Sequence, residues 1–311
     1  MSQEKATVHK AVMVSEAMEA LQPRAGGRYL DATLGGGTHS MELLKLSAPD
    51  GCVLSLDVDP TALSRAEQQN VYGKRWQIVE SNFSHLKEVA EKSGWMPFDG
   101  ILFDLGLSSD ELADPSKGLS FQIDGPLDMR LGPKANDDGL TAATIVNSWS
   151  EHELTEFIRA YGEEKFAARI ARAIIERRRQ KPIVSTLDLA NLIKASVPNL
   201  HAAIHPATRT FQALRIAVND ELAVLKSALD QADEILAPNG TIAVISFHSL
   251  EDRIVKQAFK KFVGYQITKK PIRPNSAETK TNPRARSAKL RAAHKNATKQ
   301  TNLCHGRTRL L

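Results

Sequence analysis

The stretch RYLDATLGGGTHS, residues 28–40, decides the fold of this chain. Residues 28–34 predict a short buried strand, and the glycines that follow it open a helix near residues 40–46. A second buried strand is predicted at residues 52–57, CVLSLD. A strand, a helix and a strand in this order predict a βαβ unit with two parallel strands.

The same alternation continues along the chain. Residues 76–79 carry a weaker strand signal and residues 98–104, FDGILFD, a strong one. Helices are predicted before them, at residues 60–69 and 84–92. Repeated units of this kind predict an α/β fold with a doubly wound parallel sheet.

After Ser109 the alternation stops for almost a hundred residues, and helical patterns replace it. Ser150 and Thr186, each followed by acids, are the expected N-caps of two of these helices. The predicted helices lie at residues 151–161, 163–179 and 186–196. This block therefore looks inserted into the α/β domain.

Strand signal resumes at residues 241–247, TIAVISF, after a long predicted helix and a turn at residues 238–240. The long helix is expected from about residue 219 to residue 236. A helix at residues 249–262 and two basic strands, at 265–270 and 288–293, complete the pattern. We expect these two strands to form the antiparallel edge of the same sheet.

These patterns predict a Rossmann-like domain in two parts, split by a helical domain that would recognise the substrate. The expected segments are residues 1–109 and 205–293 for the Rossmann-like domain, 110–204 for the helical domain and 294–311 for a disordered basic extension.

The composition agrees with a globular protein: of 311 residues, 42% are hydrophobic and 25% charged. The longest apolar stretches, such as residues 242–247, are far shorter than the roughly 20 residues that span a bilayer. The N-terminus lacks the apolar segment of a secretory signal. Cys52 and Cys304 are too few for a disulfide framework. We therefore expect a cytoplasmic protein without a membrane segment.

The formal net charge of +5 hides an asymmetry along the chain. From Arg253 to the end there are 16 Lys and Arg residues and one acid, a charge of +15, whereas residues 1–252 carry 25 bases and 35 acids, a charge of −10. Such a polycation would neutralise nucleic-acid phosphates. A solvated basic tail is the alternative. The candidate phosphate contacts here are Arg284, Arg286, Lys289 and Arg291.

The glycine loop, residues 35–39, stands where a doubly wound fold binds the nucleoside part of a cofactor. Asp57, 22 residues after Gly35, ends the second predicted strand, where a carboxylate can accept both ribose hydroxyls. A tight turn with a capping acid is the simpler structural interpretation. A dinucleotide fingerprint would require glycine at position 40, where Ser40 stands, so S-adenosylmethionine is favoured over NAD.

The sulfonium of S-adenosylmethionine is a cation, and acids at the strand ends suit it. Asp31, Asp57 and Asp104 are such acids. His39 lies near them, but the chain lacks the tight spacing of a metal site, so we expect no metal.

The loop Asp104-Leu-Gly-Leu-Ser-Ser109 follows the strong fourth strand and would border the acceptor atom. The exocyclic amine of a base is a poor nucleophile, because its lone pair is delocalised into the ring. An enzyme must hold such a base out of its stack and accept hydrogen bonds from the amine. Asp104, Ser108 and Ser109 supply acceptors, although this loop is also an ordinary exit from a strand.

Seven motifs in this order resemble the family of bacterial small-subunit rRNA methyltransferase H, also called MraW. The match runs from about His9 to Ala293. The motifs are Asp31-Ala-Thr-Leu-Gly, Asp104-Leu-Gly-Leu-Ser-Ser, Gly118-Leu-Ser-Phe with Asp124-Gly-Pro-Leu-Asp-Met-Arg130, Tyr161-Gly-Glu-Glu, His205-Pro-Ala-Thr-Arg-Thr-Phe-Gln-Ala-Leu-Arg215, Ser246-Phe-His-Ser-Leu-Glu-Asp-Arg-Ile-Val-Lys256 and Asn282-Pro-Arg-Ala-Arg-Ser-Ala-Lys289.

The resemblance implies a class I S-adenosylmethionine-dependent methyltransferase fold with an inserted helical domain, acting on N4 of a cytidine in the decoding region of 16S rRNA. It implies 16S rRNA or the small ribosomal subunit as partner and leaves open whether the protein is a homodimer. The cofactor contacts that it implies fall on Gly35, Gly37, Thr38, His39, Asp57, Phe83, Asp104 and Glu111.

Three positions depart from the family's pattern. Thr38 stands where the family has glycine and adds a Cβ where the backbone should approach the methionine part of the cofactor. Glu111 replaces glutamine, which removes an amide donor and adds a charge near the sulfonium. Ala11 replaces a proline.

Three further residues have two interpretations each. Asp128 and Arg130 either face the base pocket or form a salt bridge beside a turn. Arg209, near His205, either contacts RNA phosphate or belongs to a helix whose other side is core. His248 is expected to cap a helix together with Ser249 and Asp252.

Two other functions fit parts of this pattern. A DNA amino-methyltransferase would use the same chemistry but usually carries a Pro-Pro-aromatic loop after the fourth strand, which residues 105–107 do not match. A non-catalytic assembly factor would have kept the fold and lost cofactor binding, and Thr38 would mark that loss.

Overall fold

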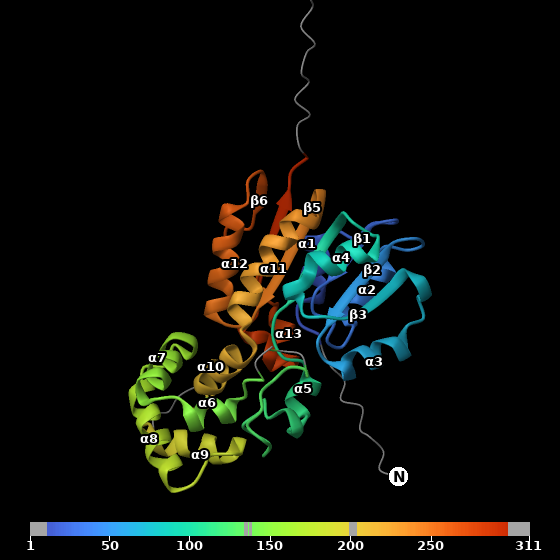
Figure 1. The fold of residues 1–311 in the computed structure, drawn as a ribbon. Helices are drawn as coiled ribbons and strands as arrows, with labels where there is room; N and C mark the ends of the chain where they lie inside the picture. Colours follow the sequence, from blue (N-terminus) through green and yellow to red (C-terminus); the bar gives the residue numbers. More distant parts are fainter. Residues whose placement is uncertain (1–10, 134–135, 137–138, 199–203, 298–311) are drawn as a thin grey trace, which may run out of the picture.

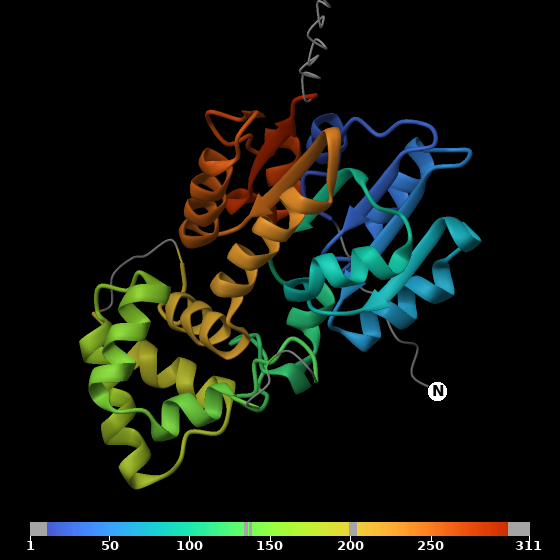
Figure 2. The same ribbon diagram turned by 45° about the horizontal axis from the view of Figure 1, so that its top comes forward.

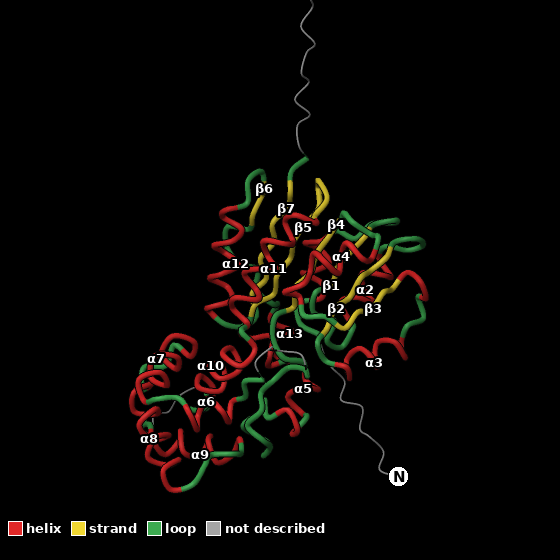
Figure 3. Tube along the Cα trace, in the orientation of Figure 1, coloured by secondary structure: helices red, strands yellow, loops and turns green. Residues whose placement is uncertain are grey.

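The computed structural model describes residues 11–133, 136, 139–198 and 204–297, and its centre is one seven-stranded sheet (Figures 1 and 3). The strand order is β3-β2-β1-β4-β5-β7-β6. The strands are β1 (Arg28–Asp31), β2 (Cys52–Asp57), β3 (Trp76–Glu80), β4 (Phe98–Asp104), β5 (Leu236–Ser246), β6 (Tyr265–Ile267) and β7 (Lys289–Lys295).

The first five strands are parallel to one another, and at one edge of the sheet β7 runs antiparallel to both of its neighbours, β5 and β6. Both features were predicted from the sequence, and the mixed seven-stranded arrangement confirms the class I methyltransferase fold. Because β7 is antiparallel to β5, with Ser246 opposite Lys289, the start of β7 lies beside the carboxyl end of β5.

Helices cover both faces of the sheet. One face packs its apolar side chains against α4 (Leu86–Ser93), α11 (Glu221–Ile235) and α12 (Ser249–Lys261). The other face packs against α1 (Val14–Leu21), α2 (Thr38–Leu46) and α3 (Pro60–Gln69). The α/β part is therefore a three-layer domain, whose strand residues such as Leu54 and Leu102 are fully buried.

The helical part has a separate apolar core and lies to one side of the sheet in both views (Figures 1 and 2). Phe211 and Leu214 belong to this core, so it takes in α10 and extends past the boundary expected at residue 204. The reason is that α10 packs its apolar side against α7. Its main helices are α6 (Ala142–Ser148), α7 (Glu151–Gly162), α8 (Ala167–Gln180), α9 (Thr186–Ser196) and α10 (Thr208–Asn219).

Several predicted boundaries were wrong for local reasons. The long helix expected from residue 219 begins at Glu221, because Asp220 takes a left-handed conformation with φ of 46° and separates α11 from α10. Glu163, with φ of 48°, likewise delays the start of α8 to Ala167. The turn at residues 238–240 lies inside β5 as an irregularity between Leu236 and Thr241.

The predicted caps were half right. Ser150 and Glu153 form a capping box on α7, as expected. The N-cap of α9 is Ser185 and not Thr186, whose hydroxyl instead donates to the carbonyl of Ile123. His248 caps α12 as predicted, but its partner in the capping box is Glu251.

Four short helices were not predicted: α1, α5 (Ser109–Ala113), α6 and α13 (Ser276–Thr281). α10 lies where Arg209 was expected on a helix. Strand β7 continues through Lys295, so the expected extension does not start at residue 294. Cys304, the match at His9 and the rest of the extension lie outside the described residues. Among the helices described, none is long and apolar enough to cross a membrane.

Candidate functional site

A cleft opens at the carboxyl ends of β1, β2, β4 and β5, where a doubly wound sheet binds its ligands. It encloses about 1250 Å³, counting the part open to solvent. The predicted site residues that line it are Gly35, Thr38, His39, Asp57, Phe83, Asp104, Ser108, Glu111 and Arg284. The fold therefore brings together residues from positions 35 to 284 of the chain.

The glycine loop is held against the end of β2. Gly35 has φ of 50°, a conformation that favours glycine, and its N–H donates to Oδ2 of Asp57 over 2.8 Å. The N–H of Asp59 donates to Oδ1 of the same carboxylate over 2.9 Å. Gly37 is the N-cap of α2 and packs against Trp76, so it shapes the loop without lining the cleft. Thr38 is the first residue of α2 and does line it.

A chain of hydrogen bonds beneath the loop explains why serine stands at position 40. The Ser40 hydroxyl donates to Oδ2 of the fully buried Asp31 over 2.6 Å. Its oxygen lies 2.8 Å from the Ser55 hydroxyl, which accepts from Nε1 of Trp76 over 2.8 Å. The serine thus ties α2 to β1 and β2, which a glycine would not do.

Asp104 ends β4 at the centre of the cleft. Its N–H donates to the Thr33 hydroxyl over 2.6 Å, and its Oδ2 lies 3.6 Å from Nδ1 of His39. His39 is buried and contacts the carbonyl of Val12 through Nε2 over 3.1 Å. The other oxygen, Oδ1 of Asp104, is buried and has no hydrogen-bond partner within the part of the chain that the structure describes.

The acids of the cleft resist ionisation. Burial, with a smaller contribution from Asp31, raises the pKa of Asp104 to about 8. Burial also raises the pKa of Asp31 to about 7 and, together with the charge of Asp57, that of Glu111 to about 7. Burial raises the pKa of Asp57 too. A group of carboxyls of this kind favours a cationic ligand, because a cation offsets the cost of ionising them.

Ser108 and Glu111 have a structural role as well. They form the capping box of α5, in which the Ser108 hydroxyl accepts from the Glu111 N–H over 3.0 Å and Glu111 accepts from the Ser108 N–H over 2.7 Å. Lys117 lies 3.8 Å from Glu111 and partly balances its charge. The side chain of Phe83, which packs edge to face on Phe103 with ring centroids 5.9 Å apart, forms an apolar wall nearby.

The remaining predicted residues lie away from the cleft or at its rim. Asp128 holds Arg130 through two hydrogen bonds of 2.7 Å, and neither residue lines the cleft. Arg209 on α10 contacts the carbonyl of Glu163 over 3.3 Å. Ser109 accepts a hydrogen bond from Arg284 over 2.7 Å.

The strand residues of the basic segment pair with α12. Asp252 accepts from Lys289 over 3.1 Å and from Arg291 over 2.7 Å, and Arg291 is only 6% exposed. Arg286 is exposed to solvent. Of the four basic residues expected to bind phosphate here, one therefore lines the cleft, one faces solvent and two fasten β7 to its neighbouring helix.

The wall opposite the glycine loop was not predicted. Arg215 on α10 donates to both carboxylate oxygens of Glu221, over 2.7 and 2.9 Å. Asn219, Glu251 and Phe247 line the cleft next to this pair. Arg215 and Glu251 lie inside two of the quoted motifs, but the apolar spacing of α10 and the capping pattern of α12 hid their position at the site.

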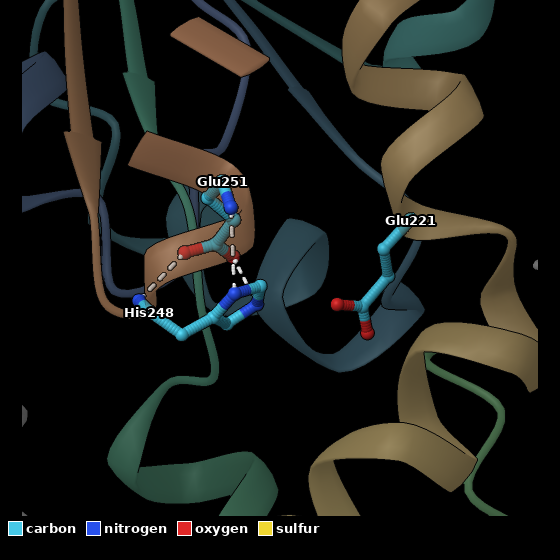
Figure 4. A group of neighbouring side chains, drawn as sticks. All are labelled: Glu221, His248 and Glu251. Carbon is cyan, nitrogen blue, oxygen red and sulfur yellow. Dashed lines mark hydrogen bonds and ion pairs between the residues drawn. The ribbon is translucent and has the colours of Figure 1, made fainter. Parts of the chain in front are cut away.

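Glu221, His248 and Glu251 form a group that could hold a metal ion (Figure 4). Both oxygens of Glu221 already bind Arg215, and Oε2 of Glu251 accepts from the backbone N–H groups of Phe247 and His248. Oε1 of Glu251 lies 3.1 Å from Nε2 of His248. Arg215 and two backbone N–H groups therefore already satisfy the carboxylates of this group, and we assign no metal to it.

Comparison with known proteins finds similarity along almost the whole chain. The model of a family described as the MraW methylase family matches residues 6–296. A protein named Ribosomal RNA small subunit methyltransferase H, from Thermomicrobium roseum, is 48% identical over 309 residues, covering 93% of this chain and 94% of its own. Proteins of the same name from Symbiobacterium thermophilum and Carboxydothermus hydrogenoformans are 45% and 46% identical, covering 92% of this chain and 96% and 97% of theirs.

The buried carboxyl of Asp104 leads to a prediction about stability. Its pKa in the folded state, about 8, lies above the ordinary value of 3.8, so the folded state binds a proton more tightly than the unfolded chain between these pH values. Stability is therefore lost as the pH rises through this window. Asp104→Asn should raise the free energy of unfolding at pH 8 by about 1–3 kcal/mol and change it little near pH 4.

Urea unfolding at several pH values measures this effect. Asp128→Asn is the matched control, because Arg130 holds the pKa of Asp128 below its ordinary value and the substitution should destabilise the protein at pH 8. Equal pH dependence in wild type and Asp104→Asn would show that Asp104 is not the group responsible.

Proposed function

This chain belongs to the MraW methylase family, and from that premise we propose that it methylates N4 of a cytidine in the decoding region of 16S rRNA. Methylation of small-subunit rRNA is the activity named in its relatives. The choice of N4 rests on the motif resemblance and on one observation: the buried Oδ1 of Asp104, an acceptor without a partner among the described residues, at the end of β4 in the cleft.

The methyl donor is S-adenosylmethionine, and the residues present fit it. Asp57 can accept the ribose hydroxyls, since each of its oxygens takes one backbone N–H and keeps a further lone pair. Phe83 offers an apolar wall to the adenine, and the loop of Gly35, Thr38 and His39 borders the methionine part. When bound, the cofactor supplies an electrophilic methyl group on a cationic sulfur.

Asp104 is the group that we propose to orient the acceptor. Its Oδ1 accepts one N–H of the amine, which turns the nitrogen lone pair toward the methyl donor. His39, 3.6 Å from Oδ2, keeps the carboxyl in place. A cationic cofactor favours the ionised form of Asp104, and that carboxylate can also take up the proton that the amine loses on methylation.

Ser108 supports the same amine as a second polar group at the cleft, and Ser109 and Asp128 have a weaker case. Ser109 is held by Arg284, and Asp128 is paired with Arg130 outside the cleft lining.

The helical part, including α10, is proposed to receive the rRNA. The proposed polar contacts to the rRNA are Arg209, Arg130 and, in the segment before β7, Arg286. A ribosomal substrate would place the reaction in the cytoplasm.

Calorimetry tests the cofactor assignment. Asp57→Ala leaves the ribose hydroxyls without their acceptor and should weaken S-adenosylmethionine binding by about 1–3 kcal/mol. Because Asp57 also fastens the glycine loop, a melting curve of the variant is the necessary control. Unchanged affinity in a folded variant would exclude this role, and absence of binding by the wild type would favour the assembly-factor function.

Mass spectrometry of 16S rRNA nucleosides tests the reaction. Cells that lack this gene should lose one N4-methylated cytidine in the decoding region. The wild-type gene should restore it, and Asp104→Ala should lower single-turnover methylation in vitro by about 100-fold or more at saturating cofactor. Asp230→Ala serves as the comparison, because Asp230 is an exposed carboxylate that does not line the cleft. A methyl group at another atom would contradict the N4 assignment.

A further inference from the structure

Arg284 reaches the reaction edge of the sheet because of the topology of β7. It lies in a short 3₁₀ segment, Pro283–Ser287, directly before β7. Since β7 runs antiparallel to β5, that segment lies at the carboxyl end of β5, next to the end of β4. Its neighbour Ala285 is fully buried in the sheet's core and anchors the segment, while Arg286 faces solvent.

The guanidinium of Arg284 is held inside the cleft and still has donors to offer. Nη1 donates to the Ser109 hydroxyl over 2.7 Å, and within the described part of the chain Arg284 has no ion pair. A guanidinium carries five N–H donors, so four remain. The other arginine of the cleft, Arg215, has its Nε and Nη2 committed to Glu221.

Three carboxyl groups and one other cation, Arg215, surround the guanidinium of Arg284. Its guanidinium interacts electrostatically with the carboxyl groups of Asp104, Glu111 and Asp110. Arg284 in turn lowers the pKa of Asp104, against the larger effect of burial. A phosphate would compete with these carboxyl groups for the guanidinium and would raise the cost of ionising them further, whereas the neutral edge of a base would not. The surroundings therefore favour a base edge over a phosphate as the partner of this guanidinium.

We propose that Arg284 recognises the target base itself, donating to N3 and O2 of the cytosine whose amine faces Asp104. This inference rests on the proposed function, since it takes a cytosine as substrate. N4, N3 and O2 share one edge of the ring, so a donor next to the acceptor Asp104 matches that edge. Uracil presents an N3–H donor to the donors of Arg284 and an O4 acceptor to the acceptor of Asp104, so both pairs would be mismatched. Arg284 is thus a specificity-determining residue and not a phosphate contact.

Methyl transfer to a synthetic decoding-region RNA, free or assembled into the small subunit, tests this proposal. The target position carries either cytidine or 3-deazacytidine, in which C–H replaces the N3 acceptor and the amine is kept. Wild type, Arg284→Met and Arg284→Lys are compared, with Arg273→Met as the control, because Arg273 is an exposed arginine of the same basic segment that does not line the cleft. S-adenosylmethionine binding and thermal melting are measured for each protein.

We expect wild-type kcat/KM to fall about 10- to 100-fold on 3-deazacytidine, and Arg284→Met to cause a similar fall on cytidine. The two changes together should cost little more than either alone, because both remove the same contact. Arg284→Lys should not restore the rate, since it keeps the charge and loses the planar fork. The salt dependence of RNA binding should not change in either Arg284 variant.

Three results would overturn the inference. The first is an additive loss from 3-deazacytidine and Arg284→Met. The second is a salt slope flattened by about 0.7–0.9 in Arg284→Met and restored in Arg284→Lys, the mark of a phosphate contact. The third is methylation of 3-deazacytidine by wild type as fast as cytidine. This result needs no variant, so it would exclude a contact to N3 even if the variants fold poorly. If wild type leaves the cytidine RNA unmethylated, the proposed function fails first and the inference with it.

Discussion

Three carboxyl groups, one buried and two half-buried, lie at the ends of three neighbouring parallel strands, and the cost of ionising them there is the constraint on which this structure depends. Asp31, Asp57 and Asp104 end β1, β2 and β4, and burial raises the pKa of each. Asp31 accepts hydrogen bonds from Ser40 and Thr33, and Asp57 accepts hydrogen bonds from backbone N–H groups. Asp104 keeps one buried oxygen without a partner in the described chain. This unpartnered oxygen destabilises the empty protein, but it lies where a cationic cofactor and an amine would meet.

The other parts of the chain complete the cleft around that point. The connection from β4 to β5 carries the helical part and returns through α10 and α11, which supply Arg215 and Glu221 as the far wall. The antiparallel β7 brings the segment of Arg284 to the same edge. The Asp252 pairs with Lys289 and Arg291 fasten β7 to α12. Sheet topology therefore gathers donors and acceptors that lie far apart in the sequence.

The sequence predicted the sheet and the cofactor side of the cleft well, because both depend on local signals. The bounds of β2, β4 and α3 match the prediction, and Asp57 lies beside the glycine loop as its spacing indicated. The opposite wall could not be predicted, since Arg215 and Glu221 sit on helices whose apolar spacing hides the break at Asp220. The positions of Lys289 and Arg291 depend on pairing with a distant strand and helix. Composition alone could not separate such residues from exposed ones like Arg286.

We infer that the acids of the cleft hold a cation. Calorimetry of S-adenosylmethionine and S-adenosylhomocysteine between pH 6 and pH 9 tests this inference. The two ligands differ in the charge on sulfur, which also lowers the pKa of the α-ammonium group of S-adenosylmethionine. Each free ligand is therefore titrated separately, and its own proton binding is subtracted from the affinities. The pKa values of about 7 for Glu111 and about 8 for Asp104 place their ionisation in this range. The preference for S-adenosylmethionine should rise about tenfold or more as the acids ionise. A ratio that stays constant across this range would show that the acids of the cleft do not hold the cationic sulfur.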